Sequence, residues 1–401
     1  MKITRKIAIN KKKLSYYVLY LLFFTVLAVI VSYGAITVKY KITDYTLANT
    51  PSNERLYCTY YNSLTYREQL LYDSITQAAE NLKTESDIIK TSYTMEDLQY
   101  IISCIRADRS DLFYVCFDEL VLYNSSHKTK VGMKYIDSKQ NIKDMIKEFD
   151  AEINNALQLV NPSMTEFEKE VVLSDYITDK CTYTAISNDL LESTAYGALV
   201  KGEAVCDGYA YAAKELFNAA HIDTMVVFGT ANESEHMWNM VNIDSDYYHL
   251  DLTWNDSDKV ENDGVHFHGY FNLSDTEISL DHKINDPESI LPKARKSNNY
   301  YKQTLCYAEN SSQLDEIIYN SLRNALKENL PYIELEYPSG NGNAEIAESL
   351  NKMIRLINEE ENEEVLSDSY RIMLANKNTN AITIQINYRK EVYHESDITE
   401  K

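Results

Sequence analysis

The chain has 401 residues, of which 44% are hydrophobic and 25% are charged, and 61 acidic residues outnumber 39 basic ones. This composition is that of a globular protein long enough to bury a core without disulfide or metal support. Ten glycines and six prolines exclude a collagen-like or low-complexity chain, and 33 tyrosines exclude a wholly disordered one.

The charge is distributed unevenly along the chain. The first 41 residues contain eight basic residues and no acid, so the rest carries all 61 acids against 31 Lys and Arg residues. A surface this acidic repels phosphate backbones and anionic lipid headgroups. We therefore expect no nucleic-acid partner, and a main body that is held beside a membrane without lying on it.

Residues 14–38 form an unbroken run of 25 uncharged residues. As a helix they would span about 37 Å, against a hydrocarbon core of about 30 Å. More basic residues precede the run than follow it, so the positive-inside rule makes residues 1–13 a cytoplasmic basic tail and places the bulk of the chain outside. A cleaved signal peptide is the alternative, because Ser32-Tyr33-Gly34 resembles a cleavage site. The length of the run favours an uncleaved, single-pass anchor in the cell membrane.

The six cysteines are scattered, with no CxxC pair and no metal-like spacing. This excludes zinc fingers and redox dithiols. If one cysteine is a working thiol, the other five cannot all pair with one another, and we expect most of them to be small buried hydrophobic residues. The cysteines are Cys58, Cys104, Cys116, Cys181, Cys206 and Cys306.

Residues 42–158 are predicted to form a mixed, largely helical N-terminal domain. The capping-box pair Thr65 and Glu68 marks the start of one helix, and residues 145–160 have the pattern of another. Residues 112–123 are rich in aromatic and β-branched residues, which predicts a strand. No residue in this region suggests chemistry.

Residues 160–290 differ from the rest in composition. A second capping box, Thr165 with Glu168, predicts a helix through about residue 180, and Asn161-Pro162 just before it marks a domain boundary. The region holds both tryptophans, six of the ten glycines and six of the eight histidines. Such clustering indicates a shaped site.

Residues 300–395 are predicted to form a small α+β accessory domain without a catalytic constellation. The apolar residues on one face of residues 344–358 indicate an amphipathic helix, and those at 382, 384 and 386 alternate as in a strand. The predicted order is helix 314–330, strand 332–337, helix 344–358, strand 370–375 and strand 381–388.

Cys206 lies where a glycine-containing turn, GEAVCDG, runs into an alanine-rich amphipathic segment, and it is therefore predicted at the start of a helix. At that position the helix dipole and free backbone N–H groups stabilise a thiolate and can receive an oxyanion. Glu203 and Asp207 flank the thiol and oppose thiolate formation, so a cationic partner is required.

His236 begins an alternating segment, a turn follows at residues 244–246, and a second strand is predicted at residues 247–254 with Asp251 on it. In an antiparallel hairpin whose loop has an even number of residues, positions 236 and 251 lie on the same face. A cysteine at a helix start, a histidine on a strand and an aspartate that orients it satisfy the requirements for nucleophile, base and orienting group.

The segments AVCDGYA, HMWN and DLTWND, in this order and at these separations, resemble the transglutaminase-like superfamily, whose members are circularly permuted relatives of papain-type cysteine proteases. The resemblance covers about residues 165–285, including YGAL at 196–199 and GYFNLSD at 269–275. It implies an α+β fold in which the helix that carries the cysteine packs on a small antiparallel sheet, within a catalytic domain at residues 160–290.

By this resemblance, Cys206 is the nucleophile, His236 the base and acid, and Asp251 the orienting carboxylate. Trp238 and Trp254 are expected to form walls of the cleft rather than to react. Tyr196 is either an oxyanion donor or a core residue.

The remaining histidines of the region give no strong prediction of a site. His266 and His268 form a His-x-His pair that could bind a metal, but no third ligand is placed by spacing, so no metal and no cofactor are predicted. His282 is expected to be a structural hydrogen bonder.

Together these features predict a membrane-anchored, extracytoplasmic thiol enzyme. It would act on amide bonds of proteins or peptides at the cell surface or in the cell wall, by acyl transfer or by hydrolysis, because both reactions share the same first half. The alternative is a non-catalytic binding or assembly module that keeps the same fold. The substrate and the oligomeric state are left open.

Overall fold

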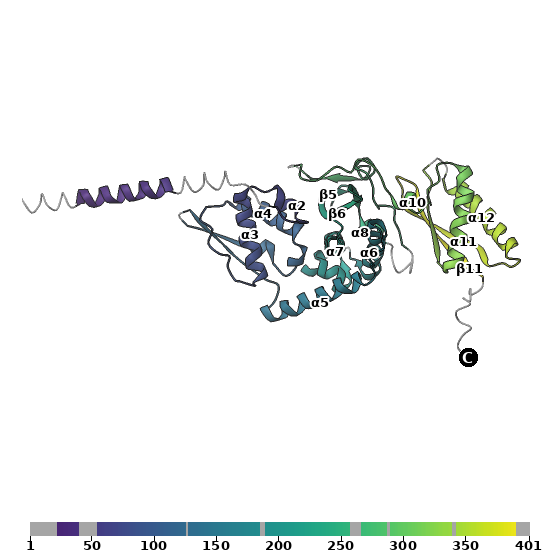
Figure 1. Ribbon diagram of the computed structural model, residues 1–401, viewed down its shortest axis with the longest axis horizontal. Helices are drawn as coiled ribbons and strands as arrows, with labels where there is room; N and C mark the ends of the chain where they lie inside the picture. Colours follow the sequence, from purple (N-terminus) through teal and green to yellow (C-terminus); the bar gives the residue numbers. More distant parts are fainter. Residues whose placement is uncertain are drawn as a thin grey trace, which may run out of the picture. The chain divides into compact units, whose positions relative to one another are not determined.

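The computed structural model describes residues 22–39, 54–125, 127–184, 189–256, 266–286, 289–338 and 342–389 (Figure 1). Among these, one helix, Leu22–Lys39, is long and apolar enough to cross a membrane, and none of its residues is buried. A signal sequence near the N-terminus has the same properties. The predicted basic tail and residues 14–21 of the predicted anchor lie outside the described residues.

The chain divides into two compact units, each built from more than one segment. This division does not coincide with the predicted domain boundaries, which stay predictions. The first unit comprises Met1–Glu54, Leu64–Ile102 and Phe117–Lys134, and the second comprises Arg55–Ser63, Ser103–Cys116 and Tyr135–Lys401.

The first unit contains helix α3 (Tyr66–Glu80), the start of α4 (Met95–Asp108) and the antiparallel hairpin of β1 (Val121–Ser125) with β2 (Lys128–Gly132). The predicted capping box is confirmed, because the Thr65 side chain accepts the Glu68 N–H and Glu68 accepts the Thr65 N–H.

The strand predicted at residues 112–123 is wrong over most of its length. The chain forms the short 3-10 turns Ser110–Leu112 and Phe117–Glu119, and the strand begins only at Val121. Consecutive residues from Leu112 to Val115 are all buried, whereas a strand with one solvated face buries alternate residues. Tertiary burial of the whole segment has overridden its strand propensity.

The second unit begins with α2 (Thr59–Ser63), α5 (Lys139–Leu157) and α6 (Glu166–Lys180). The capping box of Thr165 with Glu168 at the start of α6 is confirmed. Helix α5 starts six residues before its predicted position, because Ser138 caps a polar first turn that carries no apolar signal.

At the centre of the second unit, α7 (Cys206–Ala219) packs on a four-stranded antiparallel sheet, as the family resemblance implied (Figure 1). The strand order is β7-β6-β5-β8. The helix buries alanines at positions 210, 212 and 213, and their small side chains permit a close approach to the strands. The strands are β5 (Thr224–Ala231), β6 (Ser234–Ile243), β7 (Asp246–Leu250) and β8 (His282–Ile284).

Short elements surround this helix and sheet. Strand β3 (Thr182–Tyr183) pairs in parallel with β4 (Glu203–Ala204), immediately before α7. The other short elements are two helical turns, Leu190–Ser193 and Gly197–Lys201, and the helices α8 (Leu252–Asn255) and α9 (Asp275–Ile278).

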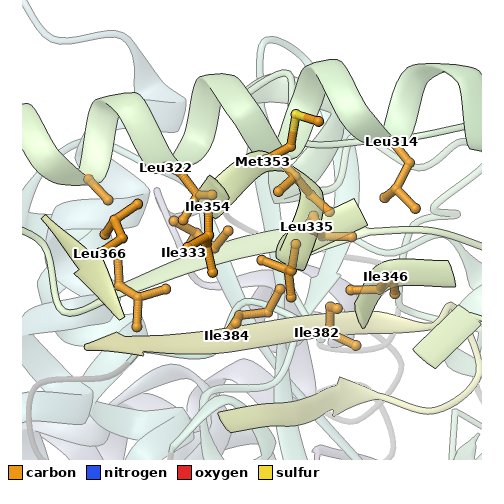
Figure 2. Close-up of a cluster of buried hydrophobic side chains, with 14 of the residues drawn as sticks. Leu314, Leu322, Ile333, Leu335, Ile346, Met353, Ile354, Leu366, Ile382 and Ile384 are labelled. Atoms are coloured by element: carbon orange, nitrogen blue, oxygen red, sulfur yellow. The ribbon is translucent and has the colours of Figure 1, made fainter. Parts of the chain in front are cut away.

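The C-terminal part of the second unit has the predicted order of elements. Its three-stranded antiparallel sheet has the order β10-β11-β9, and helices α11 and α12 cover one face of it (Figure 2). The predicted alternation in the last strand is confirmed by the burial of Ile382, Ile384 and Ile386. The elements are α10 (Tyr300–Gln303), α11 (Ser311–Glu328), β9 (Tyr332–Glu336), α12 (Gly342–Glu360), β10 (Leu366–Asn376) and β11 (Ala381–Tyr388).

Candidate active site

Cys206 is the first residue of α7, as the sequence predicts, and it is only partly buried. A close backbone approach fixes this helix start: a Cβ on Gly208 would lie 2.6 Å from the Ala204 Cβ and 2.8 Å from the Glu192 carbonyl oxygen. Only glycine fits there without a backbone shift. The sulfur is thus held at the positive end of a 14-residue helix.

His236 and Asp251 are brought to the same face by the hairpin of β6 and β7. The turn between the strands has two residues, Asp244 and Ser245, both with positive φ, so the loop has the even length that same-face placement requires. The second strand ends at Leu250, four residues before its predicted end.

Asp251 caps α8 instead of continuing the strand. Its Oδ1 accepts the Trp254 N–H at 3.2 Å, while its Oδ2 lies 2.7 Å from His236 Nε2. Both carboxylate oxygens therefore have partners, and the side chain is completely buried. Asp251 therefore lies between β7 and α8, whereas the sequence predicted it within a strand.

The pKa values of His236 and Asp251 are strongly shifted. Burial disfavours the charged form of His236, but the charge and hydrogen bond of Asp251, with smaller effects from Cys206, raise the pKa of His236 to about 10. Burial likewise opposes ionisation of Asp251, yet His236 and His282 lower the pKa of Asp251 to about 2. At neutral pH an imidazolium therefore faces an ionised carboxylate.

The proton positions on His236 follow from these partners. The carboxylate only accepts hydrogen bonds, so His236 donates through Nε2, and its Nδ1 is the nitrogen left for Cys206. The hydrogen bond and charge of Cys206 contribute to the raised pKa of His236. A cationic imidazole beside the sulfur is the partner that a thiolate requires.

Asp207 is the flanking acid that reaches the sulfur. Its Oδ1 lies 3.5 Å from Cys206 Sγ, whereas Glu203 is exposed. Burial raises the pKa of Asp207, although its hydrogen bond from Cys206 and the charges of Arg106 and His236 act in the opposite direction. Asp207 therefore competes with His236 for the sulfur, as its sequence position suggested.

His236 lines two cavities, and Cys206 lines the first of them. One, of about 550 Å³, is lined by Cys206, His236, Tyr183 and Trp254 among other residues. The second, of about 470 Å³, is also lined by His236 and includes Asp207, Arg106 and Tyr211. Cys206 and His236 thus line the same open cavity.

The two tryptophans support His236 from different sides. Trp238 is buried, its ring stacks on that of His236 with centroids 6.1 Å apart, and its Nε1 donates to His249 Nδ1 at 3.1 Å. Trp254 lines the larger cavity, and its ring centroid lies 6.0 Å from that of His236. Only Trp254 is placed where a cleft wall was expected.

Tyr196 is not brought to the sulfur. Its hydroxyl donates to Glu148 Oε2 at 2.6 Å, and its ring stacks on Phe113 with centroids 4.7 Å apart. Of the two roles left open by the sequence, the surroundings of Tyr196 are those of a core residue, and it takes no part in the function proposed below.

His282 is a hydrogen bonder, as predicted, but the sequence did not place it beside Asp251. Its Nε2 lies 3.0 Å from Asp251 Oδ2, the same oxygen that binds His236. His236, Asp251 and His282 are also the residues here that could hold a metal ion, since one donor atom from each lies within 4.8 Å of the others. The distances from Asp251 Oδ2 to His236 Nε2 and to His282 Nε2, 2.7 and 3.0 Å, are nevertheless those of hydrogen bonds.

The His-x-His pair lies elsewhere in the second unit. His268 is buried between Glu334, 2.8 Å from its Nδ1, and Asp175, 3.0 Å from its Nε2. His266 lies 3.6 Å from Asp175. The charges of Glu334 and Asp175 outweigh the effect of burial and raise the pKa of His268 to about 10.

Comparisons with known proteins agree with the predicted resemblance. Residues 154–252 match the family model of the transglutaminase-like superfamily, and no curated protein matches the chain. A solved structure of a TGase is similar at 18% identity and a TM-score of 0.25, covering 34% of this chain and 44% of that one.

Two further solved structures are similar at 14% identity and also cover 34% of this chain. One is a candidate cysteine protease from Cytophaga hutchinsonii, with a TM-score of 0.24 and 61% of its length covered. The other is a candidate protease from Parabacteroides distasonis, with a TM-score of 0.22 and 35% covered. This chain spans less than two thirds of each of these proteins. Residues 154–252, which include Cys206, His236 and Asp251, form a domain of the transglutaminase-like superfamily.

Proposed function

We propose that the protein is a thiol enzyme that cleaves or transfers acyl groups at amide bonds, with Cys206 as nucleophile, His236 as acid and base, and Asp251 as the orienting carboxylate. The observation that carries this proposal is the 2.7 Å hydrogen bond between His236 Nε2 and Asp251 Oδ2, which leaves Nδ1 as the nitrogen available to Cys206, a residue that lines the same open cavity as His236.

The first half of the reaction would form a thioester. The Cys206 thiolate attacks the carbonyl carbon of an amide, and the C–N bond breaks as the Nδ1 proton of His236 passes to the departing amine. The developing oxyanion would be stabilised by backbone N–H groups in the first turn of α7, where the helix dipole also favours negative charge. His236 is then neutral and stays bonded to Asp251.

The second half would release the acyl group. Neutral His236 takes a proton from an incoming amine or a water molecule, which attacks the thioester carbonyl and restores the thiolate and imidazolium. An amine would give a new amide, and water would give a carboxylic acid. Substrates would be proteins or peptides at the cell surface or in the cell wall, with the enzyme anchored by its N-terminal helix and its bulk outside the membrane.

One observation favours a non-catalytic module as the second candidate. The Cys206 thiol can donate a hydrogen bond to Asp207 Oδ1 at 3.5 Å, and a thiol that keeps its proton in this way would be unreactive as a nucleophile. The protein would then use the fold as a surface binding or assembly platform.

Alkylation of the full-length protein in detergent separates the two candidates. We expect iodoacetamide to modify Cys206 at pH 6.5 at least about tenfold faster than a free thiol such as glutathione, because a thiolate reacts and a thiol does not. Peptide mass spectrometry would resolve Cys206 from the other five cysteines, which serve as internal controls. Alkylation no faster than that of glutathione, or unaffected by His236→Ala, would favour the platform.

A second measurement decides between transfer and hydrolysis. A glutamine-bearing protein is incubated with the enzyme and a tagged primary amine, and incorporated tag, released ammonia and cleaved peptide are measured in parallel. Incorporation of the tag indicates transfer, ammonia release without the tag indicates deamidation, and new peptide ends indicate proteolysis. The Cys206→Ala variant is the control and should give none of the three products.

A further inference from the structure

Asp251 receives two imidazoles on one oxygen. His236 Nε2 lies 2.7 Å and His282 Nε2 lies 3.0 Å from Oδ2, while Oδ1 accepts the Trp254 N–H. A carboxylate bonded only to His236 could turn about its side-chain torsions, whereas three donors fix both of its oxygens. His282 thus restricts the atom that orients the proposed base.

His282 is itself held from its other nitrogen. Nδ1 lies 2.6 Å from Asp281 Oδ1, and the second oxygen of Asp281 accepts the Tyr270 hydroxyl at 2.7 Å. The His282 ring is fully buried, with centroids 4.5 Å from Trp254 and 5.0 Å from Trp238. The ring is therefore sealed away from any substrate and acts only through Asp251.

The C-terminal sheet contributes the last contact of this chain of hydrogen bonds. Asn378, in the turn between β10 and β11, donates to Asp281 Oδ2 at 2.5 Å. The same hairpin packs against the backbone of the core: Asn376 donates to the Gly269 carbonyl at 2.8 Å, and a Cβ on Gly269 would lie 2.5 Å from the Ala375 carbonyl oxygen. The C-terminal sheet is thus joined to the proposed site by specific contacts.

The protons on His282 follow from its partners. Asp251 is ionised and only accepts hydrogen bonds, so His282 Nε2 carries a hydrogen. Nδ1 faces a second carboxyl group, that of Asp281, at 2.6 Å. His282 Nε2 is therefore the donor that Asp251 Oδ2 accepts from.

We propose that His282 is a positioning residue of the site, held by Asp281 and by Asn378 of the C-terminal hairpin, and that it fixes Asp251 so that His236 keeps Nδ1 on the sulfur. This inference rests on the proposed thiol chemistry and extends it, because it gives the C-terminal domain a part in reactivity. His282 touches neither the sulfur nor the cavities and is not a catalytic residue.

The test uses the alkylation rate of Cys206 in the full-length protein, a measurement that a merely structural role of His282 would not change in folded protein. We expect His282→Leu to lower the rate at pH 6.5 by about 10- to 100-fold, through loss of the donor to Asp251. His282→Gln keeps an N–H donor and should recover the rate to within about threefold of wild type.

The matched control is His268→Gln, which alters another buried histidine held between two carboxylates but leaves Asp251 untouched. It should alkylate at the wild-type rate. Circular dichroism and the unfolding midpoint of each variant establish that the protein compared is folded.

The outcomes separate this inference from the function on which it rests. If Cys206 of the wild-type protein reacts no faster than a free thiol, both the proposed thiol chemistry and the positioning role of His282 are overturned. A reactive wild type together with a folded His282→Leu variant of unchanged rate overturns only the positioning role. If His282→Leu does not fold, Asn378→Ala decides: this exposed substitution should lower the rate two- to fivefold, and an unchanged rate overturns the proposal.

Discussion

His236, which is partly buried, and His268, which is buried, belong to the same unit and have the same raised pKa, about 10, in different surroundings. His268 bonds carboxylates through both nitrogens, Asp175 on one side and Glu334 on the other, and its ring stacks on Tyr300 with centroids 3.8 Å apart. His236 bonds one carboxylate, and its other nitrogen is left for a sulfur beside an open cavity.

The comparison shows that a raised histidine pKa does not identify a reactive site. Neighbouring carboxylates cause most of the rise in pKa at both histidines, so the two histidines differ in the group beside the second ring nitrogen and in solvent access. His268 joins α6, through Asp175, to β9, through Glu334, and so ties the family domain to the C-terminal sheet. We expect one histidine to matter for reactivity and the other for stability.

The largest expected effect is on reactivity at His236. His236→Asn removes the cation beside the sulfur and the general acid and base, which should lower turnover in the amine-incorporation or hydrolysis assay by about 10³-fold. Asp251 keeps its hydrogen bonds from His282 and Trp254, so the free energy of unfolding should fall by only about 1–2 kcal/mol. Urea unfolding checks the second value. If His236→Asn is largely unfolded but its folded fraction keeps the wild-type turnover, His236 matters for stability and not for reactivity. The distinction between the two histidines would then be wrong.

The converse effect is expected at His268. His268→Gln leaves the buried Glu334 and the half-buried Asp175 without their cation, and the free energy of unfolding should fall by about 3 kcal/mol. The alkylation rate of Cys206 in the folded variant should equal that of wild type. If the rate falls with stability unchanged, His268 belongs to the reactive site and the comparison is wrong.

The pH dependence of stability sharpens the same contrast. The pKa of His268 is about 10 in the folded protein and about 6.5 in the unfolded chain, so its stabilising contribution is complete below pH 6.5 and is lost as pH rises through 10. Between pH 8 and 10 the free energy of unfolding should therefore fall by about 1 kcal/mol per pH unit more in wild type than in His268→Gln. Urea unfolding at several pH values gives this difference, in which contributions common to both proteins cancel. Parallel curves for the two proteins would show that His268 is not charged in the folded state.

Much of the proposed site follows from the sequence because its determinants are local. The helix start at Cys206 is marked by a glycine-containing turn, and the hairpin that joins His236 to Asp251 needs only an even loop length to place both on one face. The amphipathic helices and the alternating last strand in the C-terminal part of the second unit were predictable for the same reason.

What the sequence could not predict depends on pairing between distant segments. His282 lies on a three-residue strand, β8, whose pairing with β5 brings it to Asp251, and three residues give too short a pattern to assign a strand or a partner. Tyr196 lies within the motif, yet its hydroxyl meets Glu148, 48 residues earlier in the chain. Asp251 ends its strand early because capping α8 satisfies a backbone N–H that a continued strand would direct elsewhere.

The smallest expected effect concerns the second carboxyl group of each site. At His268 a second carboxylate binds the imidazole, whereas at the proposed active site Asp207 lies against the sulfur, 3.5 Å from Sγ. Asp207→Asn removes a negative charge that opposes the thiolate, so alkylation of Cys206 at pH 6.5 should become about two- to fivefold faster. Glu203→Gln is the matched control, because this exposed acid is screened by solvent and its loss should change the rate by less than about 1.5-fold. A slower rate in Asp207→Asn would instead mean that Asp207 helps to orient the sulfur. The two sites would then be alike, because each would use two carboxyl groups to hold its reactive or charged side chains.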